Sequence, residues 1–279
     1  MKPTHGDYVL GSHGTELDRL GVQHTLWRDL MLDGWRRAGL GPGTRVVDVG
    51  AGPGFATADL STIVGATGAV TAVDRSSTFL ATLQARFAEP MSNVTIHEVD
   101  LMREAIPCPN GNHDAAWCRW VAMFVPDPAL LLERINDALR PGGVVILHEY
   151  CRYETLSMLP RKSEIDSFTA LASKSFRAAG GEPDIAGVLL ATLVRRGFEV
   201  CEVRPIARGA RFGDPLWQWP AGFVRTYAPR LVELGFADAA WCAGVLHALE
   251  AAEQDGVSLF LTPMVLEIIA RKPVERINS

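Results

Sequence analysis

The chain has 279 residues, of which 48% are hydrophobic and 21% charged, as in a globular protein that buries a substantial core. This length favours one core domain that carries insertions. The net charge of -5, from 27 basic and 32 acidic residues, argues against a nucleic-acid partner, because phosphate backbones require clustered Lys and Arg.

The cysteines and the apolar segments indicate a cytoplasmic protein. The five cysteines are widely spaced and form no CxxC pair, which favours reduced thiols over a disulfide framework. The N-terminal sequence lacks the apolar run of a secretory signal, and the most apolar stretch, residues 257–270, is interrupted by Pro263 and Glu267. We therefore expect a cytoplasmic location and no membrane partner.

The first 43 residues predict an N-terminal arm followed by a helix. Apolar and aromatic side chains recur at helical spacing from Leu17 to Trp35, and a glycine-rich stretch at residues 39–43 ends the element.

From residue 44 onward, short β-branched runs alternate with helical stretches. The predicted strands are residues 45–49, 69–73, 94–99, 115–118, 144–148, 198–205 and 259–271. The predicted helices are residues 54–64, 76–89, 127–140 and 184–196. This alternation predicts a doubly wound α/β fold, with a mostly parallel seven-stranded sheet and helices on both faces.

Two segments, residues 151–183 and 207–256, do not follow the alternation. Both have a helical pattern, and the second is rich in aromatic residues. We interpret them as insertions of the domain at residues 44–279, folding as a lid over the carboxyl edge of the sheet.

The first strand runs into a turn with glycines at 50, 52 and 54, and a helix follows. Residues without side chains let the backbone turn sharply and approach a ligand closely. A dinucleotide-binding turn requires G-x-G-x-x-G, but its third position falls on Phe55. The turn alone leaves NAD and S-adenosylmethionine as competing cofactors.

Carboxylates end the next two strands. Asp74 follows the second strand, where it could accept both hydroxyls of a ribose or could merely cap the helix that follows. Asp100 ends the third strand and suits the exocyclic amine of adenine, with the backbone amide of Leu101 available to a ring nitrogen. Two acids at successive strand ends, with no glycine at position 55, favour the sulfonium cofactor.

These motifs resemble those of the class I S-adenosylmethionine-dependent methyltransferases over roughly residues 44–208. Residues 117–128 and the Leu-Arg-Pro-Gly-Gly stretch at 139–143 are also similar to the family's fourth strand and the turn beyond it. The resemblance implies that Gly50, Gly52 and Gly54 cradle the methionine portion of the cofactor, that Asp74 holds the ribose and that Asp100 faces adenine.

The N-terminal segment resembles the arm of bacterial small-molecule methyltransferases of the natural-product type. In these relatives the arm closes over the cofactor, which implies that Tyr8, Arg19 and Gln23 contact its methionine end. Arg119, just after the fourth strand, is a further candidate for the cofactor's carboxylate, because a guanidinium pairs well with carboxylates.

Two histidines are candidates for the catalytic base. His148 ends the fifth strand, where a methyl acceptor is expected in this fold, and imidazole titrates near neutral pH. His24 lies on an apolar helix face, a position that is more often that of a buried structural histidine. No metal site is expected from the sequence.

We therefore predict methyl transfer from S-adenosylmethionine to an O, N or C atom of a small organic metabolite, as in secondary metabolism. An NAD(P)-dependent oxidoreductase and a non-catalytic S-adenosylmethionine-binding module remain as alternatives. The acceptor and the oligomeric state stay open.

Overall fold

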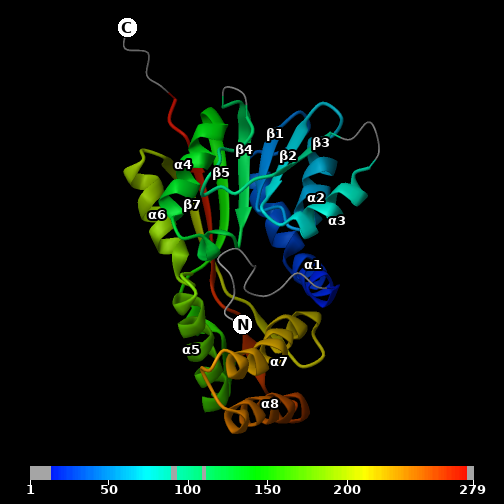
Figure 1. The fold of residues 1–279 in the computed structure, drawn as a ribbon, viewed down its shortest axis with the longest axis vertical. Helices are drawn as coiled ribbons and strands as arrows, with labels where there is room; N and C mark the ends of the chain where they lie inside the picture. The colour runs from blue at the N-terminus through cyan, green and yellow to red at the C-terminus, as the bar shows by residue number, and fades with distance from the viewer. Residues whose placement is uncertain (1–13, 89–92, 109–110, 275–279) are drawn as a thin grey trace. The chain divides into compact units, whose positions relative to one another are not determined.

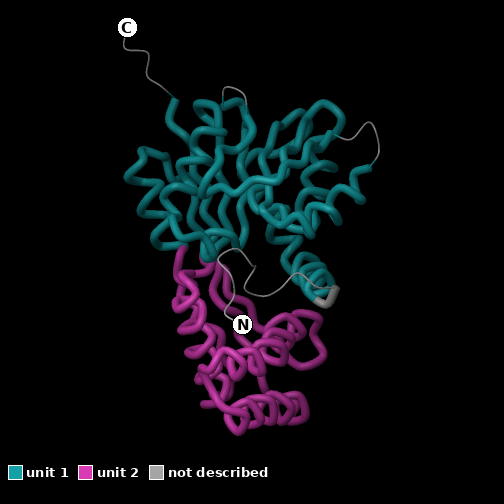
Figure 2. The backbone as a smooth tube through the Cα atoms, in the orientation of Figure 1, with its two compact units in different colours: residues 1–149, 186–204, 266–279 teal, residues 150–185, 205–265 magenta. Residues whose placement is uncertain are grey.

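The computed structural model describes residues 14–88, 93–108 and 111–274 (Figure 1). The chain divides into two compact units (Figure 2). Residues 1–149, 186–204 and 266–279 form the first, here called the sheet unit, and residues 150–185 and 205–265 form the second, here called the insertion unit. Within the described ranges, no helix is both long enough and apolar enough to cross a bilayer.

The sheet unit has the predicted alternation of strands and helices. Its strands are β1 (Arg45–Val49), β2 (Ala69–Asp74), β3 (Val94–Glu98), β4 (His113–Arg119), β5 (Leu139–Tyr150), β7 (Glu199–Ile206) and β10 (Val265–Arg271). Its helices are α1 (Gly14–Arg37), α2 (Phe55–Val64), α3 (Ser77–Arg86), α4 (Pro128–Ala138) and α6 (Ile185–Arg195), with a short 3-10 helix at Ala122–Phe124.

The seven strands form one sheet in the order β3-β2-β1-β4-β5-β10-β7. The pairs β1–β2, β1–β4, β2–β3 and β4–β5 are parallel. The direction of winding therefore reverses at β1, and open α/β sheets bind ligands at the carboxyl ends of the strands beside such a switch point. The prediction of a doubly wound, mostly parallel seven-stranded sheet is confirmed.

Helices α1, α2 and α3 cover one face of the sheet. Trp35 of α1 and Leu60 of α2 share a core cluster with Val46 of β1. Leu83 of α3 clusters with Ala72, which by the register of β1 and β2 lies on the same side as Val46. The other face is buried as well, as expected for a parallel sheet covered on both sides.

The structure corrects the boundary between α4 and β5. We expected a helix to Arg140 and a strand only from Val144, but the helix ends at Ala138 and the strand begins at Leu139. Residues 141–143 lie within β5 because they form backbone hydrogen bonds with the residue that follows β10. Gly142 donates to the carbonyl of Lys272 (3.1 Å), and Lys272 donates to that of Gly143 (2.8 Å). A shift of register in β4 after His113 accommodates the irregularity.

The predicted last strand, residues 259–271, is two strands. Pro263, which cannot donate a ladder hydrogen bond, separates β9 (Leu259–Leu261) from β10. Strand β10 runs antiparallel to β5, since Lys272 pairs beside Gly142 whereas Glu267 lies beside His148.

The insertion unit has its own sheet and core. Its elements are β6 (Ser157–Leu159), α5 (Ser163–Ala178), β8 (Gly209–Arg211), α7 (Gln218–Glu233), α8 (Ala239–Gln254) and β9, with 3-10 helices at Tyr153–Thr155 and Pro215–Trp217. Strands β6, β9 and β8 form an antiparallel three-stranded sheet that the helical sequence pattern did not indicate. The Trp217 ring packs on Phe260 (5.1 Å between centroids), and Tyr227 is buried against Phe176. The lid function of this unit stays a prediction.

Candidate cofactor site

A cavity of about 380 Å³ opens at the carboxyl ends of β1 to β4, within the sheet unit. This volume lies in the range of small-molecule sites. The predicted site residues among its lining are Gln23, His24, Gly50, Gly52, Asp74, Asp100, Leu101 and Arg119. The structure thus gathers on one cavity residues that the sequence separates by almost a hundred positions. Tyr8 lies outside the described residues.

The glycine turn serves two purposes. At Gly50 (φ 69°) a Cβ atom would lie 2.2 Å from Cγ2 of Val121, so only glycine permits this packing. At Gly52 (φ 55°) a Cβ atom would meet no protein atom within 4 Å, although the residue lines the cavity. Bare backbone therefore faces open space at Gly52, as a closely approaching ligand requires.

Gly54 does not line the cavity. Its φ is 83°, and a Cβ atom there would lie 2.8 Å from Cγ of Leu83 in α3. The residue is a glycine because α3 packs against the turn, so its contribution to the site is indirect.

Asp74 caps the turn before α3, and its place in the cavity lining leaves the predicted ribose contact possible. Its Oδ1 accepts from the amide of Ser76 (2.8 Å) at the start of α3, and its Oδ2 accepts from the amide of Gly52 (2.8 Å). Burial raises the pKa of this carboxyl, and the two amides oppose that rise. Each carboxylate oxygen can accept a second hydrogen bond, so the capping contacts leave acceptor capacity on the cavity side.

The other two acids at the cavity differ in exposure. Asp48 is buried, accepts a hydrogen bond from Oγ1 of Thr57 (2.6 Å), and has its pKa raised to about 6 by burial. Asp100 is half-buried, and its Oδ1 accepts from the amide of Met102 (3.0 Å). Asp48 thus ties β1 to α2, whereas Asp100 keeps a carboxylate at the cavity rim.

The helix α1 contributes Gln23 and His24 to the cavity, while Arg19 is not among the lining residues. The Arg19 guanidinium donates to both carboxylate oxygens of Glu16 (2.7 Å each) and to Oε1 of Gln23 (2.9 Å). Arg19 therefore contacts a lining residue, Gln23, through a hydrogen bond rather than lining the cavity itself.

His24 connects α1 to α2 and β4. Its Nε2 lies 3.0 Å from Oδ2 of Asp59, and its Nδ1 lies 3.2 Å from Nη2 of Arg119. Burial lowers the pKa of His24 to about 4, with the positive charge of Arg119 acting in the same direction. The imidazole is therefore neutral at pH 7, and each of its nitrogens already has a partner.

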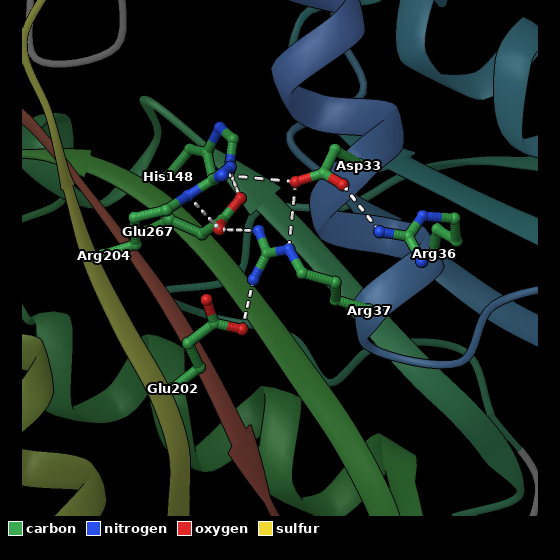
Figure 3. Close-up of polar contacts among 7 residues, drawn as sticks. All are labelled: Asp33, Arg36, Arg37, His148, Glu202, Arg204 and Glu267. Carbon is green, nitrogen blue, oxygen red and sulfur yellow. Dashed lines mark hydrogen bonds and ion pairs between the residues drawn. The ribbon is translucent and has the colours of Figure 1, made fainter.

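His148 does not reach the cavity. It is fully buried, and its Nε2 lies 2.6 Å from Oε2 of Glu267 on β10 (Figure 3). Arg37 and Arg204 pair with the other oxygen of Glu267, Oε1. Burial lowers the pKa of His148, and Glu267 only partly opposes this. With no exposed edge, this imidazole is poorly placed to take a proton from an acceptor, and the structure does not support the base that we expected here.

Glu149 was missed by the sequence reasoning. Its Oε1 accepts from the amides of Val121 (2.8 Å) and Ala122 (2.9 Å), in the cavity wall after β4, and its Oε2 has no hydrogen-bond partner among the described residues. Burial raises its pKa to about 8. The same wall contains Trp120 at φ 54°, an unfavourable angle for a bulky residue. An acid ending an apolar strand was the only available signal.

The fold of the chain is similar to that of solved methyltransferase structures. Residues 46–143 match the sequence model of a family described as "Methyltransferase domain". The match runs from β1 to the first part of β5 and covers about a third of the chain.

Individual relatives agree with this assignment. Demethylmenaquinone methyltransferase from Staphylococcus aureus is 33% identical over 127 residues, which are 46% of this chain and 50% of that enzyme. The chain thus spans about half the length of the relatives that it matches in sequence. Among solved structures, geranyl diphosphate C-methyltransferase from Streptomyces coelicolor, crystallised with S-adenosyl-L-homocysteine, has a TM-score of 0.53 at 15% identity (89% of this chain, 76% of that chain). The [4+2]-cyclase SpnF has the same TM-score at 21% identity (88% and 80%). These two likenesses concern the fold.

Proposed function

We propose that this protein transfers a methyl group from S-adenosylmethionine to an O, N or C atom of a small organic metabolite. The observation that carries the proposal is the convergence of Gly52, Asp74 and Asp100 on one cavity. The methyltransferase domain at residues 46–143 supports it, as does the activity on small molecules named for the similar proteins.

The residues at the cavity fit this cofactor. The open space beside the bare backbone of Gly52 accommodates a closely approaching ligand, and the two carboxylates suit the hydroxyls of a ribose and the amine of adenine. Arg119 and Gln23 line the same cavity and suit the carboxylate and the amine of a methionine portion. Phe55, where a dinucleotide-binding turn would have glycine, also lines the cavity, which disfavours the alternative of a pyrophosphate-bearing cofactor.

The chain's contribution to the reaction is binding and alignment. Asp74 binds the ribose, while Asp100 and the amide of Leu101 bind the base. When bound, the cofactor supplies a methyl group on a sulfonium. The sulfur leaves the methyl group as a neutral thioether, so the leaving group requires no acid. Holding the reacting atoms in line can provide much of the acceleration. We assign no base, because both nitrogens of His24 are occupied and His148 is fully buried.

A binding measurement tests the cofactor. Isothermal titration should show that S-adenosylhomocysteine binds and NADH does not. Asp74→Asn should weaken S-adenosylhomocysteine binding by about 1.5–3 kcal/mol, roughly 10- to 150-fold, because the ribose loses a charged acceptor. Asp114→Asn is the matched control, since that carboxylate pairs with Arg140 and is not among the lining residues. Binding of NADH in place of S-adenosylhomocysteine would refute the assignment.

A turnover measurement separates an enzyme from a silent binding module or another chemistry on this fold. The protein is incubated with methyl-labelled S-adenosylmethionine and a metabolite extract. Label should enter small molecules. Label found only in macromolecules, or tight binding without any transfer, would refute the proposed reaction. The absence of a nucleic-acid partner rests on the charge pattern of the sequence, and the cytoplasmic location rests on its cysteine spacing and apolar segments. Both stay predictions.

A further inference from the structure

His24 lies between a carboxylate and a guanidinium that come from distant parts of the sequence. Asp59 of α2 is 3.0 Å from its Nε2, and Arg119 at the end of β4 is 3.2 Å from its Nδ1. Only 7% of the His24 surface is exposed. The three side chains therefore form a hydrogen-bonded row from the surface of α2 to the cavity.

The chemistry of the row permits one arrangement of protons. A guanidinium can only donate, so Nδ1 of His24 must be the acceptor and carry no proton. The ring proton is then on Nε2, which donates to Asp59. Asp59 is itself held by Arg28, whose Nε and Nη2 donate to it at 2.8 Å each. Asp59, held by Arg28, thereby helps to fix the tautomer and the orientation of His24.

Arg119 is held from two sides. His24 and Met31 contact Nη2 and Nη1 of its guanidinium (3.2 and 3.6 Å), and the Arg119 Cζ atom lies over the rings of Trp120 and Trp117, 5.0 and 5.7 Å from their centroids. Arg119 follows Cys118, which pairs with Val49 of β1, so it lies on the β1 side of the cavity. The other cation in the lining, Arg75, lies instead beside Asp74.

We propose that His24 is a positioning residue that, together with Asp59, holds the Arg119 guanidinium in the orientation that binds the carboxylate of the cofactor's methionine portion. This inference rests on the proposed function, and it replaces the role of base that the sequence suggested for His24. An imidazole occupied on both nitrogens cannot accept a proton from a substrate, but it can prevent rotation of a guanidinium. A fixed Arg fork loses less conformational entropy when it pairs with a carboxylate.

The test compares two ligands that differ at the group in question. S-adenosylhomocysteine carries the amino-acid carboxylate, whereas 5′-methylthioadenosine has the same nucleoside thioether without it. His24→Leu should weaken binding of S-adenosylhomocysteine by about 10- to 100-fold, the size of one charge-assisted contact, and change binding of 5′-methylthioadenosine by less than about threefold. His24→Asn, which retains a side-chain acceptor near the position of Nδ1, should restore most of the lost affinity.

Two further variants keep the test decisive if His24→Leu folds poorly. Arg119→Gln should remove the same preference, and so should His24→Gln, which keeps a polar group toward Asp59 but no acceptor at the position of Nδ1. The double variant Arg119→Gln, His24→Gln should then show no additional loss, because the two residues act as one unit. His113→Leu is the matched control: this buried histidine is bonded to Oγ1 of Thr71 and is not among the lining residues, so the ratio of the two affinities should not change.

The outcomes distinguish a failure of the positioning role of His24 from a failure of the proposed function. Equal weakening of both ligands by the His24 variants, or no weakening of either, overturns the positioning role while the cofactor assignment stands. Failure of the wild-type protein to bind S-adenosylhomocysteine overturns the proposed function, and the inference with it.

Discussion

Glu267 is the most buried charge of the cluster in Figure 3, and its replacement tests how much that cluster stabilises the sheet unit. The side chain has no exposed surface, and its carboxylate pairs with His148 (2.6 Å), Arg204 (3.1 Å) and Arg37. Burial alone would raise the pKa of Glu267, but the hydrogen bond from His148 and the nearby arginines lower it. The carboxylate is therefore ionised at pH 7, and Glu267→Gln removes a buried charge.

The expected cost follows from what the partners retain. Removing one member of a buried ion pair costs about 3–5 kcal/mol, because the remaining charge is left uncompensated. Arg37 keeps contacts to Asp33 (3.0 Å) and Glu202, and Arg204 keeps one to Asp33 (3.2 Å). We therefore expect the lower end of that range, about 3 kcal/mol.

Glu202→Gln provides the matched control. It makes the same chemical change at a partner of the same Arg37 guanidinium, but the Glu202 side chain is 38% exposed. An ion pair so accessible to solvent contributes about 0–1 kcal/mol. The two variants thus differ in the burial of the lost charge.

The assay is urea unfolding at pH 7, followed by hydrogen exchange of peptides from β5 and β10, which report on the sheet unit rather than on the insertion unit. A loss of about 3 kcal/mol should lower the urea midpoint by about 1–3 M. An equal loss in both variants, or a loss below about 1 kcal/mol for Glu267→Gln, would refute the reasoning that burial determines the contribution of this pair.

Two further predictions concern the walls of the cavity. Glu149 has a folded-state pKa of about 8 against 4.5 for the free group, so the native state holds a proton that the unfolded chain releases, and stability falls as pH rises from about 4.5 to 8. Glu149→Gln cannot ionise and should gain more than about 2 kcal/mol relative to wild type between pH 5 and pH 8, measured by urea unfolding; a constant difference would falsify the raised pKa. Gly52→Ala, whose methyl group enters the cavity, should weaken S-adenosylhomocysteine binding and change the melting temperature little. Gly54→Ala, whose methyl group meets Leu83, should do the reverse, and a common effect of both variants would contradict the distinction.

Much of the fold and part of the cavity could be predicted from the sequence because they depend on local patterns. The alternation of β-branched runs with helical stretches predicts the doubly wound sheet. The rule that parallel strands present their carboxyl ends at one edge then places Gly52, Asp74 and Asp100 together. Each of these predictions requires only a strand, a turn and their order.

The hydrogen-bond partners of the two histidines come from far away in the chain. His148 stands at a strand end, as a base would, but Glu267 lies 119 residues later and takes its Nε2. His24 contacts Asp59, 35 residues away, and Arg119, 95 residues away. A sequence pattern gives the period of an element and its turns, but it does not show which side chains of other elements face it.

The same limit explains the boundaries that the sequence misplaced. The Pro-Gly-Gly stretch at residues 141–143 has the local character of a turn, yet it lies in β5 because Lys272 of the last strand's end pairs with it. Two short strands in the insertion segments, β6 and β8, became visible only where they pair with β9. Local composition thus determined which elements form and in what order. Long-range hydrogen bonds and burial decided where the elements end and which polar groups remain available for chemistry, since both depend on neighbours that only the folded chain brings into contact.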